Sequence, residues 1–206
     1  MLPEENISKF GSGTPQVALV VGHSRKYGGN EGGGFSEHAW WLPRCKQIGQ
    51  KLWNEYGISS IVTHRNGNGV FRSLEFWDEY NDEKFTYRIL DVPVIHFHLN
   101  GKDESLPDSQ PRGHEVLYAR GSAQGKALAE RMNAAAGEAL GNPDRGLKPL
   151  SPGDNASDLV FSPKVGVVVE PAFLDVAADR QNLFDKSREL ENAYVKAIAQ
   201  AIKDGE

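Results

Sequence analysis

The sequence predicts an α/β fold, in which a largely parallel, twisted sheet of about five or six strands carries helices on both faces. Short, continuous apolar runs that end at glycine or at a charged residue are typical of strands buried on both faces. Longer segments with helical spacing of apolar residues alternate with these runs. No linker divides the 206 residues, so a single domain is predicted.

The first half of the chain is predicted to begin with a flexible lead-in over residues 1–15, which is polar and interrupted by glycine and proline. The catalytic domain then covers residues 16–206. In order, the predicted elements are a strand at 16–22, a helix at 37–56, a strand at 59–64, a poorly patterned helix at 73–87 and a strand at 92–99. Gly57 is the expected stop of the first helix. The residues expected to face inward from that helix are Ala39, Leu42, Ile48, Leu52 and Trp53.

The second half repeats the alternation. The predicted elements are a strand at 114–119, a helix at 122–140, a loop at 141–158, a strand at 164–170 and a final helix that runs to about residue 203. The segment "KVGVVVE" at 164–170 is a buried strand that ends abruptly in a carboxylate.

Composition excludes several classes of function. The net charge of −5 argues against general binding of nucleic acid, which needs a basic face. No apolar run reaches membrane-spanning length, and the start "MLPEENISKF" lacks a basic segment followed by an apolar one, so no signal peptide is expected. The single cysteine, Cys45, allows no internal disulfide; a low-pKa nucleophile is conceivable there, but a structural thiol on a helix face is favoured.

Histidine and glutamate side chains mark one edge of the predicted sheet. His23 follows the first strand, His98 lies at the end of the strand at 92–99, Glu170 closes the last strand, and Glu37 opens the first helix. Ligands bind at the carboxyl ends of parallel strands, so these four side chains are expected to converge. Two histidines and one carboxylate can hold zinc with a position left open for water, while the other glutamate acts as a base.

Each of these residues also has a structural interpretation. A histidine after a strand, such as His23, is often a loop residue or the partner in a structural hydrogen bond. Glu37 could be a first-turn glutamate favoured by the helix dipole, and His98 could cap its strand. Glu170 could belong to an ion pair, although a carboxylate that closes "VGVVV" is costly to bury unpaired.

His96 and His98 stand two residues apart in "PVIHFHLN". Residues i and i+2 of a strand point to the same face, so both histidines could bind zinc and form a three-histidine site with His23. The patterns HExxH, GxSxG and GxxxxGK[ST] are absent. His38, His64 and His114 remain structural or rim residues.

Several motifs in one order carry a resemblance to a known family. In chain order they are "VALVVGHS", the helix-start Glu37, "IHFHLN", "GHEVLYA", "RGLK", "VVVEPAFLD" and "AIAQAIKDG". They resemble the zinc-dependent N-acetylmuramoyl-L-alanine amidases of the amidase-3 type, cell-wall hydrolases that include phage endolysins. The resemblance covers nearly the whole chain from residue 16 onward.

This resemblance implies that one Zn²⁺ is held by His23, Glu37 and His98, and that Glu170 is the catalytic base. The implied substrate is peptidoglycan, cleaved at the amide between N-acetylmuramate and L-alanine by zinc-activated water. The stretch between residues 100 and 113 is too short for the autoinhibitory helix of the cell-division members. A lysin-like monomer that reaches the wall after lysis or through a membrane pore is therefore expected.

Three further residues, Asn100, Arg145 and His96, are candidates for supporting roles at the site. Asn100 and Arg145 are candidate substrate contacts, although an arginine in a loop is as commonly only solvated. His96 is expected to hydrogen-bond a group beside the ligands. Two alternative functions are a zinc carboxypeptidase or deacylase of related fold and a wall-binding module with an inactive site.

Overall fold

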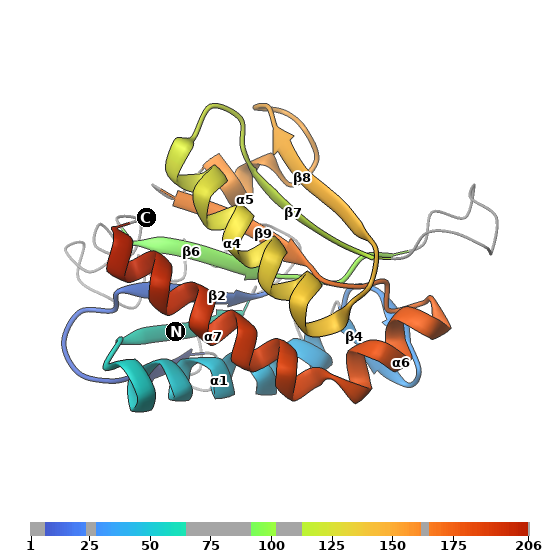
Figure 1. Ribbon diagram of the computed structural model, residues 1–206, viewed down its shortest axis with the longest axis horizontal. Coiled ribbons are helices and arrows are strands. Elements are labelled where there is room, and N and C mark those ends of the chain that lie inside the picture. The colour runs from blue at the N-terminus through green and yellow to red at the C-terminus, as the bar shows by residue number, and fades with distance from the viewer. Residues whose placement is uncertain (1–6, 24–27, 65–91, 102–112, 162–164, 206) are drawn as a thin grey trace.

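One mixed sheet lies at the centre of the molecule (Figure 1), and seven strands of the described residues belong to it. The computed structural model describes residues 7–23, 28–64, 92–101, 113–161 and 165–205. The strand order is β1-β5-β2-β6-β9-β7-β8. The strands are β1 (Ile7–Phe10), β2 (Val17–Val21), β5 (Ser60–His64), β6 (Pro93–Phe97), β7 (His114–Ala119), β8 (Asp144–Leu150) and β9 (Val165–Glu170). The predicted helix at 73–87 lies outside the described residues.

The middle of the sheet is parallel, which confirms the predicted fold class. Strands β5, β2, β6 and β9 run in the same direction, so their carboxyl ends share one edge. Strand β7 pairs antiparallel to β9 and parallel to β8, and β1 pairs antiparallel to β5. The amino-terminal end of β7 therefore meets the carboxyl end of β9, where Glu115 lies directly opposite Glu170.

The seven strands exceed the predicted five or six, and the two edge strands β1 and β8 lie where no strand was predicted. Strand β1 lies in the segment predicted to be a flexible lead-in, and β8 lies in the predicted loop at 141–158. Among the described strands, each pairs with one neighbour, so polar residues and Pro149 can be accommodated there. An edge strand of this kind lacks the continuous apolar run by which buried strands are recognised.

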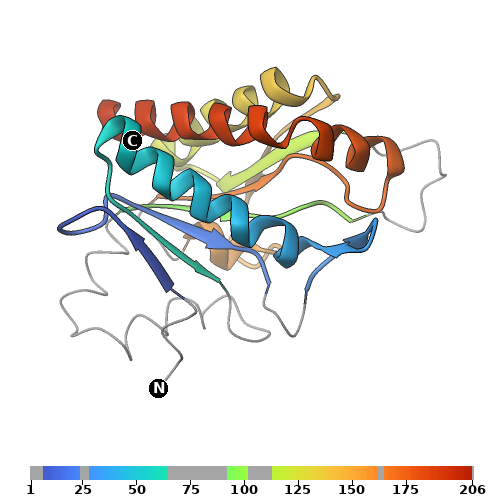
Figure 2. The same cartoon turned by 90° about the horizontal axis from the view of Figure 1, so that it is seen from below.

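Helices cover both faces of the sheet. Helices α1 (Glu37–Tyr56), α4 (Ala123–Leu140) and α7 (Ser187–Asp204) lie side by side on one face (Figure 2). They pack on alternate residues of the central strands, such as Leu19 and Phe97, to form the main core. On the other face, the short α5 (Ser157–Phe161) contacts Val168 and Ala119. Helix α6 (Ala177–Asp185) precedes α7, and a small hairpin of β3 (Glu31–Gly32) and β4 (Phe35–Ser36) precedes α1.

Helix α1 has the predicted boundaries because both of its ends are capped. The Ser36 hydroxyl accepts a hydrogen bond from the Ala39 backbone nitrogen at 3.2 Å, and Gly57 ends the helix in the left-handed conformation at φ 67°. The prediction of its inward face was wrong at Ala39 and Trp53, which are exposed. The buried stripe instead follows Trp41, Cys45, Ile48 and Leu52. None of the helices in the described part of the chain has the length and apolar character needed to cross a membrane.

Candidate metal centre

Three potential metal ligands converge at the carboxyl edge of the sheet. His23 lies two residues after the end of β2, His98 follows the adjacent parallel strand β6, and Glu37 is the first residue of α1. One ligand atom from each side chain lies within 4.8 Å of the other two. The structure therefore brings together three of the residues that the strand ends identify in the sequence.

The spacing of these atoms suits a zinc ion. His98 Nδ1 lies 2.8 Å from Glu37 Oε1, and His23 Nε2 lies 3.4 Å from Glu37 Oε2. The two imidazole rings are edge-to-face, with centroids 5.1 Å apart. Tetrahedral zinc with ligand bonds of 2.0–2.1 Å would separate its ligand atoms by about 3.3 Å. The donor set of two nitrogens and one carboxylate fits that metal and leaves a fourth position.

Glu37 is the most buried member of the cluster, with no exposed surface. Asn30 donates to Glu37 Oε2 from its backbone nitrogen at 3.2 Å and from its amide nitrogen at 3.3 Å. Burial raises the pKa of Glu37, but hydrogen bonds and charge from His23 and His98 outweigh it and bring the pKa to about 2. Glu37 is therefore a buried carboxylate that favours positively charged partners.

Two glycines allow the ligands to approach each other. A Cβ at Gly22 would lie 2.7 Å from the His98 ring, and a Cβ at Gly29 would lie 2.6 Å from Glu37 Oε2. Gly29 also has a positive φ of 80°. His23 itself has φ 61°, which is uncommon for a residue with a side chain and typical of strained functional positions.

Glu170 closes β9 at the same edge and is paired in register with Glu115 of β7. Burial raises the pKa of Glu170, and the negative charges of Glu115 and Glu37 raise it further, while Arg145 lowers it in part. Glu170 is thus a carboxyl group whose proton affinity is well above normal. This property is expected of a group that takes and returns a proton near neutral pH.

Glu115 organises the surroundings of Glu170. Its Oε1 accepts a hydrogen bond from the Asn100 amide at 3.0 Å, and its Oε2 accepts one from Arg145 Nε at 3.0 Å. Lys148 Nζ lies 3.6 Å from the same oxygen. Sequence reasoning gave Glu115 no role, although "GHEVLYA" contains it. Through Glu115, Asn100 and Arg145 come to lie beside the catalytic candidate.

The other histidines whose side chains the structure describes lie outside the ligand cluster. His96 is buried within β6 and is not part of the cluster, which contains His98 instead. His38 is buried on α1, and His114 Nδ1 pairs with the Asn142 amide oxygen at 2.8 Å. The side chain of His64 lies outside the described residues.

Cys45 is fully buried in α1, and burial raises the pKa of its thiol. Both observations favour the structural thiol over the reactive nucleophile.

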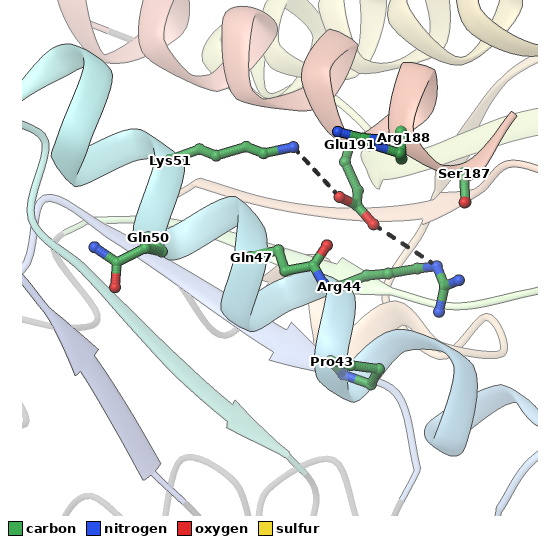
Figure 3. Close-up of a pocket in the computed structure, with 8 residues that line it drawn as sticks. All are labelled: Pro43, Arg44, Gln47, Gln50, Lys51, Ser187, Arg188 and Glu191. Atoms are coloured by element: carbon green, nitrogen blue, oxygen red, sulfur yellow. Dashed lines mark hydrogen bonds and ion pairs between the residues drawn. The ribbon is translucent and has the colours of Figure 1, made fainter.

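A polar pocket lies between α1 and α7 (Figure 3), and none of its lining residues belongs to the ligand cluster. It is lined by Pro43, Arg44, Gln47, Gln50, Lys51, Ser187, Arg188 and Glu191. Glu191 is buried and pairs with Lys51 at 3.4 Å and with Arg44 at 3.9 Å. These pairs satisfy the buried carboxylate and join the two helices, so the pocket has the character of a structural contact.

Comparison with known proteins supplies a family. The model of the N-acetylmuramoyl-L-alanine amidase family matches residues 17–204. No curated protein sequence matches.

Solved structures share the fold at low sequence identity. N-acetylmuramoyl-L-alanine amidase AmiC2 of Nostoc punctiforme is 24% identical with a TM-score of 0.67, over 94% of this chain and 98% of that one. An N-acetylmuramoyl-L-alanine amidase from Clostridium difficile 630 is 16% identical with a TM-score of 0.64, over 94% and 97%. The catalytic domain of the CD27L endolysin, which targets Clostridia difficile, is 22% identical with a TM-score of 0.61, over 91% and 96%.

Proposed function

The chain belongs to the N-acetylmuramoyl-L-alanine amidase family. From this premise we propose that it hydrolyses the amide bond of its substrate with the help of one zinc ion, which is held by His23, Glu37 and His98. The family activity is hydrolysis of peptidoglycan at the amide between N-acetylmuramate and L-alanine. The match favours this activity over a carboxypeptidase, a deacylase or an inactive wall-binding module.

The observation that carries the proposal is the convergence of three ligand atoms within 4.8 Å, beside a carboxyl group of raised pKa. When bound, zinc would polarise the amide carbonyl and lower the pKa of a water molecule. Glu37 contributes the negative charge that retains a divalent cation. His23 and His98 contribute imidazole nitrogens, each of which lies near a different oxygen of that carboxylate.

Glu170 is the proton carrier in this proposal. Its carboxylate accepts the proton of the attacking water and then donates it to the nitrogen of the leaving L-alanine. The raised pKa supports the second step, because a carboxyl group of ordinary pKa would release the proton to solvent too readily. Asn100 and Arg145 are the proposed substrate contacts, and their hydrogen bonds to Glu115, which lies opposite Glu170, support this role.

We further propose that residues 16–206 form the catalytic domain, and that the protein acts as a lysin-like monomer. It would reach the wall after cell lysis or through a membrane pore. Detection of a longer precursor cleaved on export would contradict this route.

Digestion of purified sacculi tests the proposal. Zinc-loaded protein is expected to release stem peptides that begin with a free L-alanine amine and to leave intact lactyl groups on the muramate, both detectable by mass spectrometry. Removal of zinc with a chelator should abolish the release, and added zinc should restore it. New reducing sugar ends, or cuts within the stem peptide, would contradict the proposed bond.

A further inference from the structure

Arg145 is held in place by one nitrogen of its guanidinium group. Its Nε donates to Glu115 Oε2 at 3.0 Å, and the centre of the guanidinium lies 5.0 Å from the centroid of the Phe173 ring. Lys148 supports the same segment by donating to the Arg145 backbone oxygen at 2.8 Å. These contacts fix the direction of a side chain that would otherwise sample many rotamers.

The terminal nitrogens of Arg145 remain available. Within the described part of the chain, the hydrogen bond from Nε is the one that the guanidinium makes. The side chain is 33% exposed, so it reaches the surface where a substrate group could approach it. The paired N–H groups of a guanidinium match the spacing of the two oxygens of a carboxylate. A guanidinium whose direction is already fixed is therefore well suited to bind a carboxylate.

The position of Arg145 relative to Glu170 narrows the choice of substrate carboxylate that Arg145 could bind. Glu115 lies directly opposite Glu170, and Arg145 binds Glu115 and is close enough for its charge to act on Glu170. Arg145 therefore lies one side chain away from the group that would protonate the leaving L-alanine. In the stem peptide, the residue after L-alanine is a glutamate joined through its side chain, and its α-carboxyl group is either free or amidated.

We propose that Arg145 binds the free α-carboxylate of this second stem-peptide residue, so that the protein prefers stem peptides with a free carboxylate to those with a carboxamide. The inference rests on the proposed function, since it places the scissile amide beside Glu170. Glu115 carries one negative charge, and Arg145 and Lys148 beside it carry two positive charges. One positive charge of this group therefore remains for a substrate carboxylate to neutralise.

A purely structural role for Arg145 makes a different prediction. If Arg145 only neutralised Glu115, its loss would lower hydrolysis of both substrates by the same factor. Recognition of a carboxylate instead changes the ratio of the two rates. The ratio is therefore the informative measurement, and it is insensitive to the fraction of correctly folded protein.

The experiment compares two muramoyl-peptide substrates that differ only in a free α-carboxylate or a carboxamide at the second residue. For the zinc-loaded wild type, kcat/KM is expected to be about ten- to hundredfold higher on the acid, the worth of a charge-assisted hydrogen bond. Arg145→Gln should lower kcat/KM on the acid by that factor more than on the carboxamide, so that the ratio of the two rates falls towards one. Calorimetric titration with the product dipeptides should show the same loss of preference in Kd.

Arg120→Gln is the matched control. Arg120 follows the far end of β7, where it donates to Ser151 and to the Pro149 backbone oxygen, and the same charge is removed there. It should retain the wild-type preference. Equal rates of the wild type on both substrates, or an equal loss on both in Arg145→Gln, would overturn the inference. Hydrolysis of the carboxamide alone still supports the proposed function, whereas hydrolysis of neither substrate by the wild type overturns that function and the inference together.

Discussion

His23, Glu37 and His98 contact one another, and this mutual contact makes the metal assignment testable. Alanine at any one of the three is expected to remove stoichiometric zinc, because two remaining ligands hold a divalent ion poorly. His96→Ala should retain zinc, since His96 lies outside the cluster, although the loss of a buried side chain should lower stability. Metal content of folded, dialysed protein is the measurement. Zinc loss in His96→Ala together with retention in His98→Ala would favour the three-histidine site.

Glu170 is predicted to act on the transition state rather than on the metal. Glu170→Gln preserves shape but cannot accept a proton, so zinc content and folding should be unchanged while turnover falls by about 10²–10⁴-fold. The fall should appear in kcat more than in KM, because the ground-state contacts are nearly preserved. Peptidoglycan hydrolysis at the wild-type rate would contradict the mechanism. Loss of zinc in this variant would make Glu170 a ligand and Glu37 the candidate base.

Single residues at strand ends could be identified from sequence because the alternation of strands and helices fixes one edge. His23, Glu37, His98 and Glu170 are located by that argument alone, and their roles come from the family resemblance. Glu115 could not be identified in this way, since it reaches the same edge from the start of an antiparallel strand. Gly22 and Gly29 are needed because a Cβ at these positions would collide with the His98 ring and with the Glu37 carboxylate. Such contacts between segments distant in the chain cannot be read from sequence spacing.

Helix α1 and strands β2 and β6 form the frame that carries the ligands. Their prediction succeeded because both ends of α1 have local capping signals and both strands are continuous apolar runs. Strands β1 and β8 have neither signal. Strand β1 forms by pairing with β5, which is distant in sequence, and β8 forms by pairing with β7, which is not a continuous apolar run. Local sequence therefore indicates the centre of the sheet better than its edges.

The junction of β2 with the metal cluster is sensitive to one methyl group. In Gly22→Ala, the new Cβ would meet the His98 ring at 2.7 Å and the Phe97 backbone oxygen at 2.8 Å, so the ring must move. Zinc affinity is expected to fall at least about tenfold, because a displacement of this size disturbs ligand geometry. Competition with a chelating dye measures the change. Gly137→Ala crowds His114, which is outside the cluster, and should keep the wild-type affinity.

The fold brings acidic and basic side chains from several elements to one edge of the sheet, and this arrangement has a cost in free energy. Glu37, Glu115 and Glu170 are drawn together by three different elements, and their mutual repulsion is offset by the histidines, Arg145 and Lys148. Bound metal would offset it further. In the metal-free protein, the uncompensated part of the repulsion must appear as a dependence of stability on pH.

The sign of that dependence follows from Glu170. Burial raises its pKa above the ordinary value of 4.5, and the charges of Glu115 and Glu37 add to the rise. Between the ordinary and the raised pKa, the folded protein binds a proton that the unfolded chain has released. The free energy of unfolding must therefore fall as pH rises through this window. Glu37 acts at lower pH, because its pKa is lowered to about 2 and its contribution is lost only as pH falls below the ordinary carboxyl range.

Metal-free protein is therefore predicted to lose stability as pH rises from about 5 to neutrality, and Glu170→Gln should lose less, because an amide has no proton to release. The difference between the two should reach at least about 1 kcal/mol, the equivalent of roughly one pKa unit. Denaturant titrations in the presence of a chelator measure it, and subtracting one curve from the other removes every contribution that the two proteins share. Glu130→Gln, on the exposed surface of α4, should follow the wild type. Parallel stability curves for the wild type and Glu170→Gln would show that Glu170 is already ionised in the folded protein. A proton carrier in that state would lack the high proton affinity on which return of the proton to L-alanine depends.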